Sequence, residues 1–326
     1  MINIAIIGCG LIGDKRATAI GNLGKLVSCF DQNTQVAKSF AEKHDCISTQ
    51  NTNEIFANAD IQVVIIATRH DSLVELAKSA LASGKHILVE KPGARNLEEI
   101  SGLLKIAESQ GEVVHVGYNH RHHRAIRKAL EITASGEIGE IMFLRARYGH
   151  GGRLGYNKEW RAEKEISGGG ELIDQGSHLL DLSLAFLGDV ELEFGATPNY
   201  FWDMPVEDNS FIVVKNRKGS IGFLHASCTE WKNTFSLEVY GKTGKLEVSG
   251  LGGSYGVEKL TYYKMLPKMG PPETYTWEFP MPDDSWEIEL KEFLEDIQST
   301  TKKSQNISSS KKVLEIIGQI YERTGR

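Results

Sequence analysis

The sequence predicts two architectures in one chain: a doubly wound parallel α/β sheet, followed by an α+β region with a large, mostly antiparallel open sheet. Three observations lead to this prediction. From residue 1 to about 120, short apolar segments alternate with helical segments, as in a parallel sheet covered by helices. The first apolar segment runs directly into a glycine-rich turn. Beyond residue 120, strand-like segments follow one another through short turns, which is typical of antiparallel pairing.

The elements of the first half alternate between strand and helix. The expected strands are 2–7, 25–30, 46–48, 61–67, 86–90 and 113–117. Helices are expected after the glycine turn and at 33–44, 53–57 and 71–83, the last ending at Gly84, which suits a left-handed terminal residue. Asn96, with Glu99 three residues later, resembles a capping box for a further helix that ends at Gly111.

The second half changes character after a basic helix expected over 121–135. A strand at 140–148 leads into a long irregular loop rich in glycine, and a helix at 171–187 follows. Two hairpins are then expected because turn residues separate paired strands. Their strands are 211–215, 220–228, 235–240 and 245–248. Two helices, 284–298 and about 309–321, follow with a polar loop between them, so the sheet is expected to carry helices on one face.

Composition limits the class of protein. The chain has 326 residues, enough for about two domains, with 40% hydrophobic and 25% charged residues and a net charge of −6. The negative charge argues against nucleic acid as the main partner. The N-terminal apolar run is too short for a secretory signal, and no stretch reaches the length of a membrane helix. The four cysteines form no CxxC pair, so we expect reduced core residues and a cytoplasmic protein.

The turn Gly8-Cys9-Gly10-Leu11-Ile12-Gly13 has the dinucleotide-binding spacing of a Rossmann domain. Gly8 permits the tight turn, Gly10 lets a pyrophosphate approach the backbone, and Gly13 lets helix and strand pack closely. The start of the helix, with Leu11 and Ile12, offers unpaired N–H groups to the phosphates. Without its context, such a triplet is an ordinary tight turn. Cys9 is expected to be a packing residue rather than a nucleophile.

Asp31 ends the second expected strand, eighteen residues after Gly13. A carboxylate at this place can accept hydrogen bonds from the hydroxyls of the adenosine ribose. No arginine follows it closely, so a 2′-phosphate would meet uncompensated negative charge. NAD is therefore favoured over NADP, although an aspartate that merely caps a turn is the alternative interpretation.

The tripeptide Glu90-Lys91-Pro92 ends the fifth expected strand. In open α/β sheets, ligands bind at the carboxyl ends of the strands, so Lys91 is placed to reach a ligand. Taken alone, the tripeptide is an ordinary charged strand end.

Four segments together resemble one known family: GCGLIG, ALASGKHILVEKP, GYNHR and GGGELIDQGSHLLDL. They resemble the family of glucose-fructose oxidoreductase, inositol dehydrogenase and MocA proteins, in family order and over nearly the whole chain. The resemblance implies that Lys91, Asp174 and His178 flank the nicotinamide and the sugar. It also implies cofactor contacts near the ends of the other strands. These are Ala67, Thr68, Arg69, Glu90, Lys91 and Asn119. Where family members often have proline and histidine after the fourth strand, this chain has Arg69 and Leu73, so this part of the pocket is expected to differ.

The residue types suit the oxidation of a secondary alcohol. Asp174 and His178 are four residues apart, hence on one face of a helix. His178 is assigned as the base or acid, because an unperturbed imidazole titrates near neutrality. Asp174 is its partner or a second group that binds the substrate, and Lys91 is the cation that favours the developing alkoxide. A plain surface pair is the alternative for Asp174 and His178 considered alone.

Other residues are candidates for binding the substrate. Tyr118 and Asn119 follow the sixth strand, where an interdomain linker is equally compatible with the sequence. The loop residues Arg153, Trp160 and Arg161 combine cations with an aromatic ring, which suits a sugar beside a phosphate or carboxylate. A solvated loop with one anchoring tryptophan is the alternative. The histidines between 115 and 123 invite a metal site, but no carboxylate or cysteine stands at matching spacing, so no metal is expected.

The sequence thus predicts an NAD-binding Rossmann domain at 1–120 and a substrate-binding and oligomerisation domain at 121–326, with the C-terminal helix packing back on the first domain. The reaction implied by the resemblance is hydride transfer between NAD and a secondary hydroxyl of a sugar, sugar derivative or cyclitol. Arg153 and Arg161 favour a nucleotide sugar or other phosphorylated sugar. The chain is expected to form a homodimer or homotetramer through its C-terminal sheet. Two alternatives stay open: a glycosidase that recycles bound NAD, and a non-catalytic NAD-sensing regulator.

Overall fold

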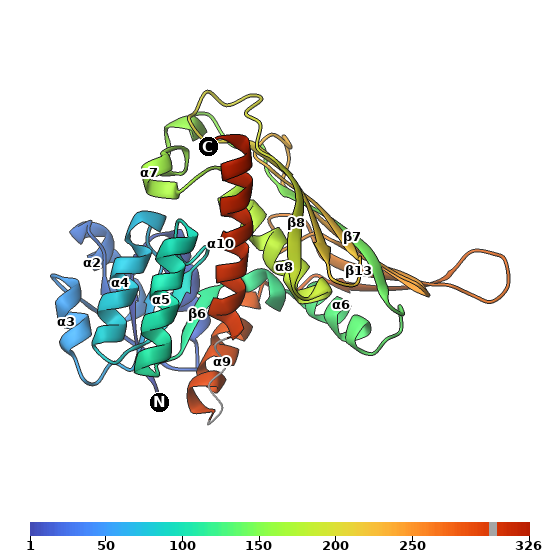
Figure 1. Cartoon of the computed structure of the whole chain (residues 1–326). Helices are drawn as coiled ribbons and strands as arrows, with labels where there is room; N and C mark the ends of the chain where they lie inside the picture. Colours follow the sequence, from blue (N-terminus) through green and yellow to red (C-terminus); the bar gives the residue numbers. More distant parts are fainter. Residues whose placement is uncertain (300–304) are drawn as a thin grey trace. The chain divides into compact units, whose positions relative to one another are not determined.

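A computed structural model describes residues 1–299 and 305–326 of the chain (Figure 1). Contacts divide it into two compact units: Met1–Tyr118 with Trp286–Leu314, and Asn119–Ser285 with Glu315–Arg326. The chain therefore passes from one unit to the other three times, whereas a division at residue 120 alone assigns everything that follows to the second unit. Within the described ranges, no helix is both long and apolar enough to cross a membrane.

The first unit contains a six-stranded parallel sheet in the order β3-β2-β1-β4-β5-β6, which confirms the doubly wound arrangement. Every residue of β4 is buried, as expected for a central strand covered on both faces. The strands are β1 Asn3–Ile7, β2 Lys25–Phe30, β3 Ile47–Ser48, β4 Val63–Ile66, β5 His86–Glu90 and β6 Val114–Gly117. Their carboxyl ends share one edge of the sheet, which is where the glycine turn and the Glu-Lys-Pro segment lie.

Three helices of the first unit begin after an asparagine whose side chain accepts from a backbone amide: Asn33, Asn51 and Asn96. Asn96 accepts a hydrogen bond from the Glu99 amide at 2.9 Å, as the capping box predicts, but the Glu99 carboxylate binds the Arg95 amide instead of that of Asn96. Gly111 ends this helix in the left-handed conformation, with φ of 87°. The helices of this part of the chain are α1 Leu11–Ile20, α2 Thr34–His44, α3 Thr52–Ala57, α4 His70–Ala82 and α5 Leu97–Gln110.

The helix α9, Ser285–Gln298, supplies part of the first unit's core although it comes late in the sequence. Leu290 and Phe293 are buried in one apolar cluster with Ile4 and Ile6 of β1. Without α9, this apolar cluster would be exposed to water at a large cost in free energy, so the first unit is complete only when this segment is present. The last helix, α10 Gln305–Thr324, has residues in both units.

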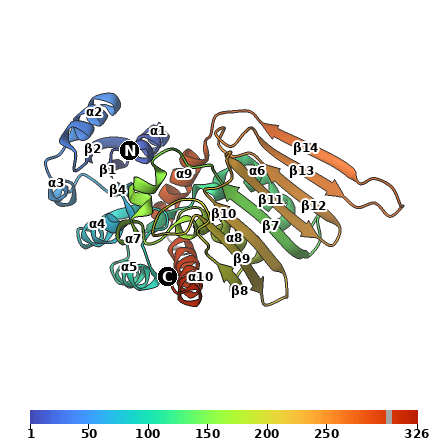
Figure 2. The same ribbon diagram turned by 90° about the horizontal axis from the view of Figure 1, so that it is seen from above.

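The second unit contains an eight-stranded sheet in the order β14-β13-β12-β11-β7-β10-β9-β8 (Figure 2). Only β7 and β10 pair in parallel, so the expectation of a mostly antiparallel sheet is confirmed. The strands are β7 Ile141–Gly149, β8 Val190–Ala196, β9 Asn209–Asn216, β10 Ile221–Ser227, β11 Thr234–Gly241, β12 Gly244–Ser249, β13 Glu258–Lys264 and β14 Glu273–Phe279. Three of these strands, β8, β13 and β14, were not expected from the sequence. Two of these strands, β8 and β14, form the edges of the sheet, where much of the strand is exposed and carries little apolar signal.

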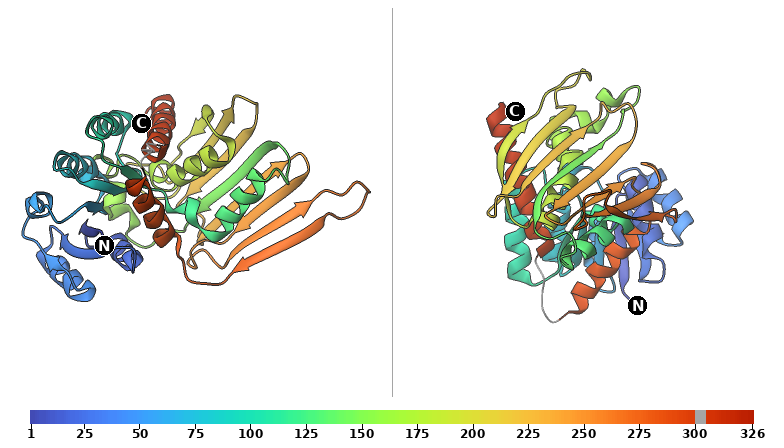
Figure 3. Two further views of the ribbon diagram at one scale, coloured as in Figure 1. Left: turned by 90° about the horizontal axis from the view of Figure 1, so that it is seen from below. Right: turned by 90° about the vertical axis from the view of Figure 1, so that its right-hand side faces the viewer.

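Two helices cover one face of this sheet: α6 Arg124–Ala134 and α8 Ser177–Leu187 (Figure 3). The opposite face carries the exposed apolar side chains Phe143, Ile221 and Phe223. The connecting segments contain single helical turns. They are the 3₁₀ turns Asn119–His122, Tyr156–Lys158 and Trp160–Ala162 and the short helix α7 Lys164–Ser167.

The helix expected over 171–187 is not a single α-helix. It begins as a π-helix, Leu172–Gly176, and continues as α8. The buried Glu207 carboxylate accepts hydrogen bonds from the Gly170 and Leu172 amides at 3.0 and 3.1 Å, which holds the chain where the π-helix starts. π-helical turns occur frequently at functional sites. The turn here carries Asp174 and leads directly to His178.

Candidate functional site

The three glycines of the first turn are each required for a different physical reason. A Cβ on Gly8, whose φ is +99°, would lie 2.5 Å from the Ala67 carbonyl oxygen, and one on Gly13 would lie 2.0 Å from that of Gly8. A Cβ on Gly10 would meet nothing within 4 Å. Gly8 and Gly13 are thus required by the fold, as predicted, whereas the space above Gly10 is left open for a ligand. The helix α1 begins at Leu11 without any side-chain cap, so its first amides suit a pyrophosphate.

Asp31 lies directly after β2 and is fixed by two backbone amides. Its carboxylate accepts hydrogen bonds from the Cys9 amide and the Asn33 amide, both at 2.9 Å. Each carboxylate oxygen can accept a further hydrogen bond, so the same group is able to bind ribose hydroxyls. These residues fit NAD, whose adenosine half needs an acidic acceptor at this place.

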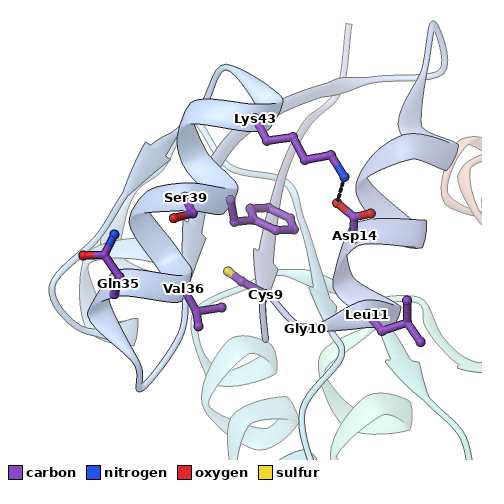
Figure 4. Close-up of a pocket in the computed structure, with 9 residues that line it drawn as sticks. Cys9, Gly10, Leu11, Asp14, Gln35, Val36, Ser39 and Lys43 are labelled. Carbon is purple, nitrogen blue, oxygen red and sulfur yellow. Dashed lines mark hydrogen bonds and ion pairs between the residues drawn. The ribbon is translucent and has the colours of Figure 1, made fainter.

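A pocket of about 450 Å³ lies beside the glycine turn, between α1 and α2 (Figure 4). An ion pair of 2.6 Å between Lys43 and Asp14 joins the two helices across it. The lining is mainly apolar, with Leu11, Val36 and Phe40, and its polar groups are carried by Asp14 and Lys43. The lining residues are Cys9, Gly10, Leu11, Asp14, Gln35, Val36, Ser39, Phe40 and Lys43.

The segment after β4 differs from the expected family pattern, and its residues have other partners. The Thr68 hydroxyl accepts a hydrogen bond from the Ser72 hydroxyl at 2.9 Å, and Arg69 forms an ion pair with Asp71 at 3.1 Å. Leu73 is completely buried in the core of the first unit. Leu73 therefore does not line a binding surface.

Glu90 belongs to a buried ion network. The Arg16 guanidinium donates from Nε to Glu90 at 2.5 Å and from Nη1 to Glu289 at 2.6 Å, and all three side chains are buried. Burial raises the pKa of Glu90, against the lowering effect of Arg16. Arg16 also stacks over Trp286 at 4.5 Å. The network supports the strand end that carries the half-buried Lys91, and the sequence analysis missed Arg16 and Glu289 because no local motif marks them.

In the second unit, the structure brings three predicted residues together. Arg161 donates from Nε to the Asp174 carboxylate at 3.0 Å, and its guanidinium lies over the Trp160 ring at 4.4 Å. Arg153, also predicted to bind the substrate, instead forms an exposed ion pair with Glu159 at 2.7 Å. Both arginines that favoured a phosphorylated substrate therefore have carboxylate partners within the chain.

His178 lies in the first turn of α8 and is only 5% exposed. Its ring stacks on His120, with centroids 3.7 Å apart and planes 13° apart. The Tyr148 ring meets both imidazoles edge-on, at 5.9 and 4.8 Å. Stacking of this kind fixes the plane of the His178 ring.

Tyr118 and Asn119 lie on either side of the boundary between the two units. Tyr118 is buried at the end of the first segment of the first unit. The Asn119 side chain donates to the Ser285 hydroxyl at 3.0 Å, which is a contact within the second unit.

Glu171 is a functional candidate that the sequence analysis missed. Its buried carboxylate accepts a hydrogen bond from the Tyr156 hydroxyl at 2.8 Å and lies 3.7 Å from His150 Nε2. Burial, followed by the charge of Asp174, raises the pKa of Glu171 to about 8. A carboxyl group with so high a pKa, next to Asp174, is typical of a functional site. The signal in the sequence was an acidic residue directly after a glycine triplet.

The histidines that suggested a metal have separate partners. His115 binds Asp296 at 2.9 Å, His123 binds Glu258 at 2.6 Å, and His120 stacks on His178. Among residues 1–299 and 305–326, no three potential ligands form a metal-binding group.

Family models match segments of both units. A family model described as "Oxidoreductase family, NAD-binding Rossmann fold" matches residues 2–118, and the "GFO/IDH/MocA C-terminal domain" matches residues 126–247. Levoglucosan dehydrogenase of Pseudarthrobacter phenanthrenivorans is 26% identical over 68% of this chain and 60% of its own length. Glucose-6-phosphate 3-dehydrogenase of Bacillus subtilis is 31% identical over 56% and 53%. The chain thus spans less than two thirds of both relatives. Inositol 2-dehydrogenase of Rhizobium meliloti is 26% identical over 79% of this chain and 76% of its own length.

Solved structures confirm the fold over almost all of the described chain. Levoglucosan dehydrogenase in complex with NADH and levoglucosan superposes with a TM-score of 0.90 at 22% identity, covering 99% of this chain and 97% of that one. KijD10, a 3-ketoreductase from Actinomadura kijaniata, gives a TM-score of 0.84 at 19% identity, covering 98% and 97%.

Proposed function

The chain belongs to the GFO/IDH/MocA oxidoreductase family and uses NAD, and from this premise we propose that it oxidises a secondary hydroxyl of a sugar, sugar derivative or cyclitol. The oxidation of such a hydroxyl is supported by the cluster in the second unit, where Arg161 holds Asp174 and the His120 ring stacks on His178. A rigid acid–base pair of this kind suits the removal of a proton from an alcohol.

In the proposed mechanism, His178 takes the proton of the substrate hydroxyl. Its ring is held in one plane by His120, so it needs no reorganisation to act. Asp174 accepts a hydrogen bond from the substrate while the Arg161 guanidinium stabilises its negative charge. Lys91 favours the alkoxide by its positive charge. Bound NAD supplies the hydride acceptor. Roles in NAD binding are proposed for the remaining predicted residues of the first unit: Gly8, Gly10, Leu11, Ile12, Gly13, Asp31, Ala67, Thr68 and Arg69.

The test is to incubate the purified protein with NAD and a panel of sugars, inositols and nucleotide sugars and to follow NADH absorbance. His178→Ala should lower kcat by about 10²- to 10⁴-fold, the usual contribution of a positioned base. His225→Gln, which changes a histidine on the opposite face of the sheet stacked on Phe211, is the control and should leave kcat unchanged. Full activity of His178→Ala would remove the assignment of the base.

Two alternative functions give different results in the same experiment. A glycosidase that recycles NAD would release a free sugar without any net NADH. A regulator would bind NAD but reduce it with none of the compounds.

The open face of the eight-stranded sheet is proposed to pair copies of the chain, as a homodimer or homotetramer. Phe143, Ile221 and Phe223 on β7 and β10 are exposed there by 36%, 43% and 49%. Adjacent exposed apolar residues in a folded sheet are typical of an interface.

A further inference from the structure

Three large aromatic side chains lie exposed on two loops of the second unit. Tyr200, Phe201 and Trp231 are exposed by 71%, 58% and 64%. Phe201 and Trp231 are in edge-to-face contact, with ring centroids 4.6 Å apart. The half-buried Trp202 meets Phe201 in the same manner at 5.1 Å. Water is a poor solvent for such surfaces, so a cluster of exposed rings indicates a binding function.

The first of these loops is rigidly held. The Asp208 carboxylate accepts hydrogen bonds from the amides of Tyr200, Phe201 and Trp202, at 2.9, 2.7 and 3.0 Å. Those bonds, with one from the Asn209 side chain, lower the pKa of Asp208 against the effect of burial. The Trp202 indole also donates to the Cys228 carbonyl at 3.0 Å. The loop is therefore a fixed platform for its rings.

Trp231 is held in an unfavourable backbone conformation. Its φ is +54°, a region that bulky residues rarely adopt. Gly151 makes room for it, since a Cβ there would lie 2.9 Å from the Trp231 Cα. Such strain occurs mainly at functional sites. Burial does not explain it, because most of the indole is exposed.

Both aromatic loops adjoin the proposed substrate site within the same unit. The Glu230 amide, next to Trp231, donates to the His150 carbonyl at 3.0 Å. Trp202 packs against Tyr156, with centroids 5.6 Å apart, and the Tyr156 hydroxyl binds Glu171. One further turn of chain leads to Asp174. A series of contacts within the second unit therefore connects the exposed rings with the acid–base cluster.

The charges in this region suit a neutral ligand. Arg153 is paired with Glu159 and Arg161 with Asp174, so each guanidinium is already matched by a carboxylate of the chain. A phosphate would have to compete with these carboxylates. The exposed rings instead suit the apolar C–H face of a pyranose, whose hydroxyls remain in water.

We propose that Phe201 and Trp231 form a binding site for a second sugar ring, so that the substrate is a neutral glycoside or oligosaccharide rather than a free monosaccharide. This inference rests on the proposed function, because it assumes that another ring of the same substrate is oxidised at the His178 cluster. One surface of the second ring stacks on the Trp231 indole, and the edge of Phe201 bounds it.

The test compares substrates that differ only by the second ring. NAD reduction is measured with methyl glucosides and with maltose, cellobiose and gentiobiose, for the parent protein, Trp231→Ala and Phe201→Ala. The best disaccharide should be at least ten-fold better in kcat/KM than the methyl glucosides, and Trp231→Ala should remove this advantage with less than a two-fold effect on methyl glucosides. Trp277→Ala, on the distant edge strand β14, is the control and should keep the advantage.

Calorimetry of disaccharide binding to the NAD-loaded protein tests the second sugar site of Phe201 and Trp231, called the platform below, separately from the proposed function. If none of the sugars reduces NAD, the proposed function fails, and the platform is then supported only by disaccharide binding that Trp231→Ala abolishes. Unchanged binding in Trp231→Ala, or equal losses for mono- and disaccharides, overturns the platform. Size-exclusion chromatography covers the remaining possibility: if Trp231→Ala dissociates an oligomer, the rings form a contact between copies and the platform is likewise overturned.

Discussion

Replacing Gly10 by alanine should separate cofactor binding from folding. Gly10 has φ of −77° and ψ of −165°, which alanine adopts readily, and a Cβ there meets nothing within 4 Å. The free energy of unfolding should therefore stay within about 0.5 kcal/mol of that of the parent protein. The added methyl group would occupy the space through which the pyrophosphate approaches the backbone. We expect the Kd for NAD to rise at least ten-fold, about 1.4 kcal/mol.

The matched control is the same change three residues later. A Cβ on Gly13 would lie 2.0 Å from the Gly8 carbonyl oxygen, so the helix or the strand must move. Such overpacking costs about 1–3 kcal/mol or more. Urea unfolding followed by tryptophan fluorescence measures stability, and titration with NADH measures binding. Parent-like NAD affinity in Gly10→Ala, or unfolding as early as that of Gly13→Ala, would refute the distinction between the two glycines.

Three further predictions follow from the described contacts. Arg16→Met leaves two buried carboxylates unpaired and should lower the free energy of unfolding by about 3–5 kcal/mol, whereas Lys43→Met breaks only a surface pair and should cost less than about 1 kcal/mol in the same urea experiment. Because the pKa of Glu171 is raised from 4.5 to about 8 on folding, the folded state binds more protons than the unfolded state between these pH values. The free energy of unfolding should therefore fall as the pH rises from 5 to 8, by at most about 1.4 kcal/mol per pH unit. Glu171→Gln should remove this fall, and an unchanged pH slope in the variant would count against the raised pKa. Phe223→Lys places a charge on the open sheet face and should dissociate the oligomer in size-exclusion chromatography, while a parent-like elution volume would exclude that face as the interface.

Local patterns were enough to predict the parts of the structure that local chemistry determines. The cap at Asn96 depends on residues three positions apart, and the glycine turn has a spacing that can be recognised locally, although Gly8 also packs against Ala67. The alternation of strands and helices then leads to a parallel sheet, because parallel strands require crossover connections.

Long-range pairings could not be predicted in this way. Arg16 meets Glu289 across 273 positions of sequence, and no period or spacing connects them. The π-helix depends on Glu207, which lies far from it in the chain and supports it through backbone amides. The pairing of Asp174 with Arg161 used two residues that the sequence analysis had assigned to the substrate separately. Each of these contacts depends on tertiary structure and leaves no trace in local composition.

The late arrival of α9 in the core of the first unit has a consequence for biosynthesis. Phe293 and Leu290 pack against β1, which is translated long before α9. Until α9 has been translated, that part of the nascent sheet has an uncovered apolar face, and Arg16 lacks one of its two carboxylate partners, Glu289. The first unit is thus begun before residues 119–285 are translated and completed only after them, and it must remain free of aggregation in the meantime. Fragments that end near residue 120 should accordingly be poor folders, and expression of the cofactor domain alone should require residues 286–314 to be joined to it.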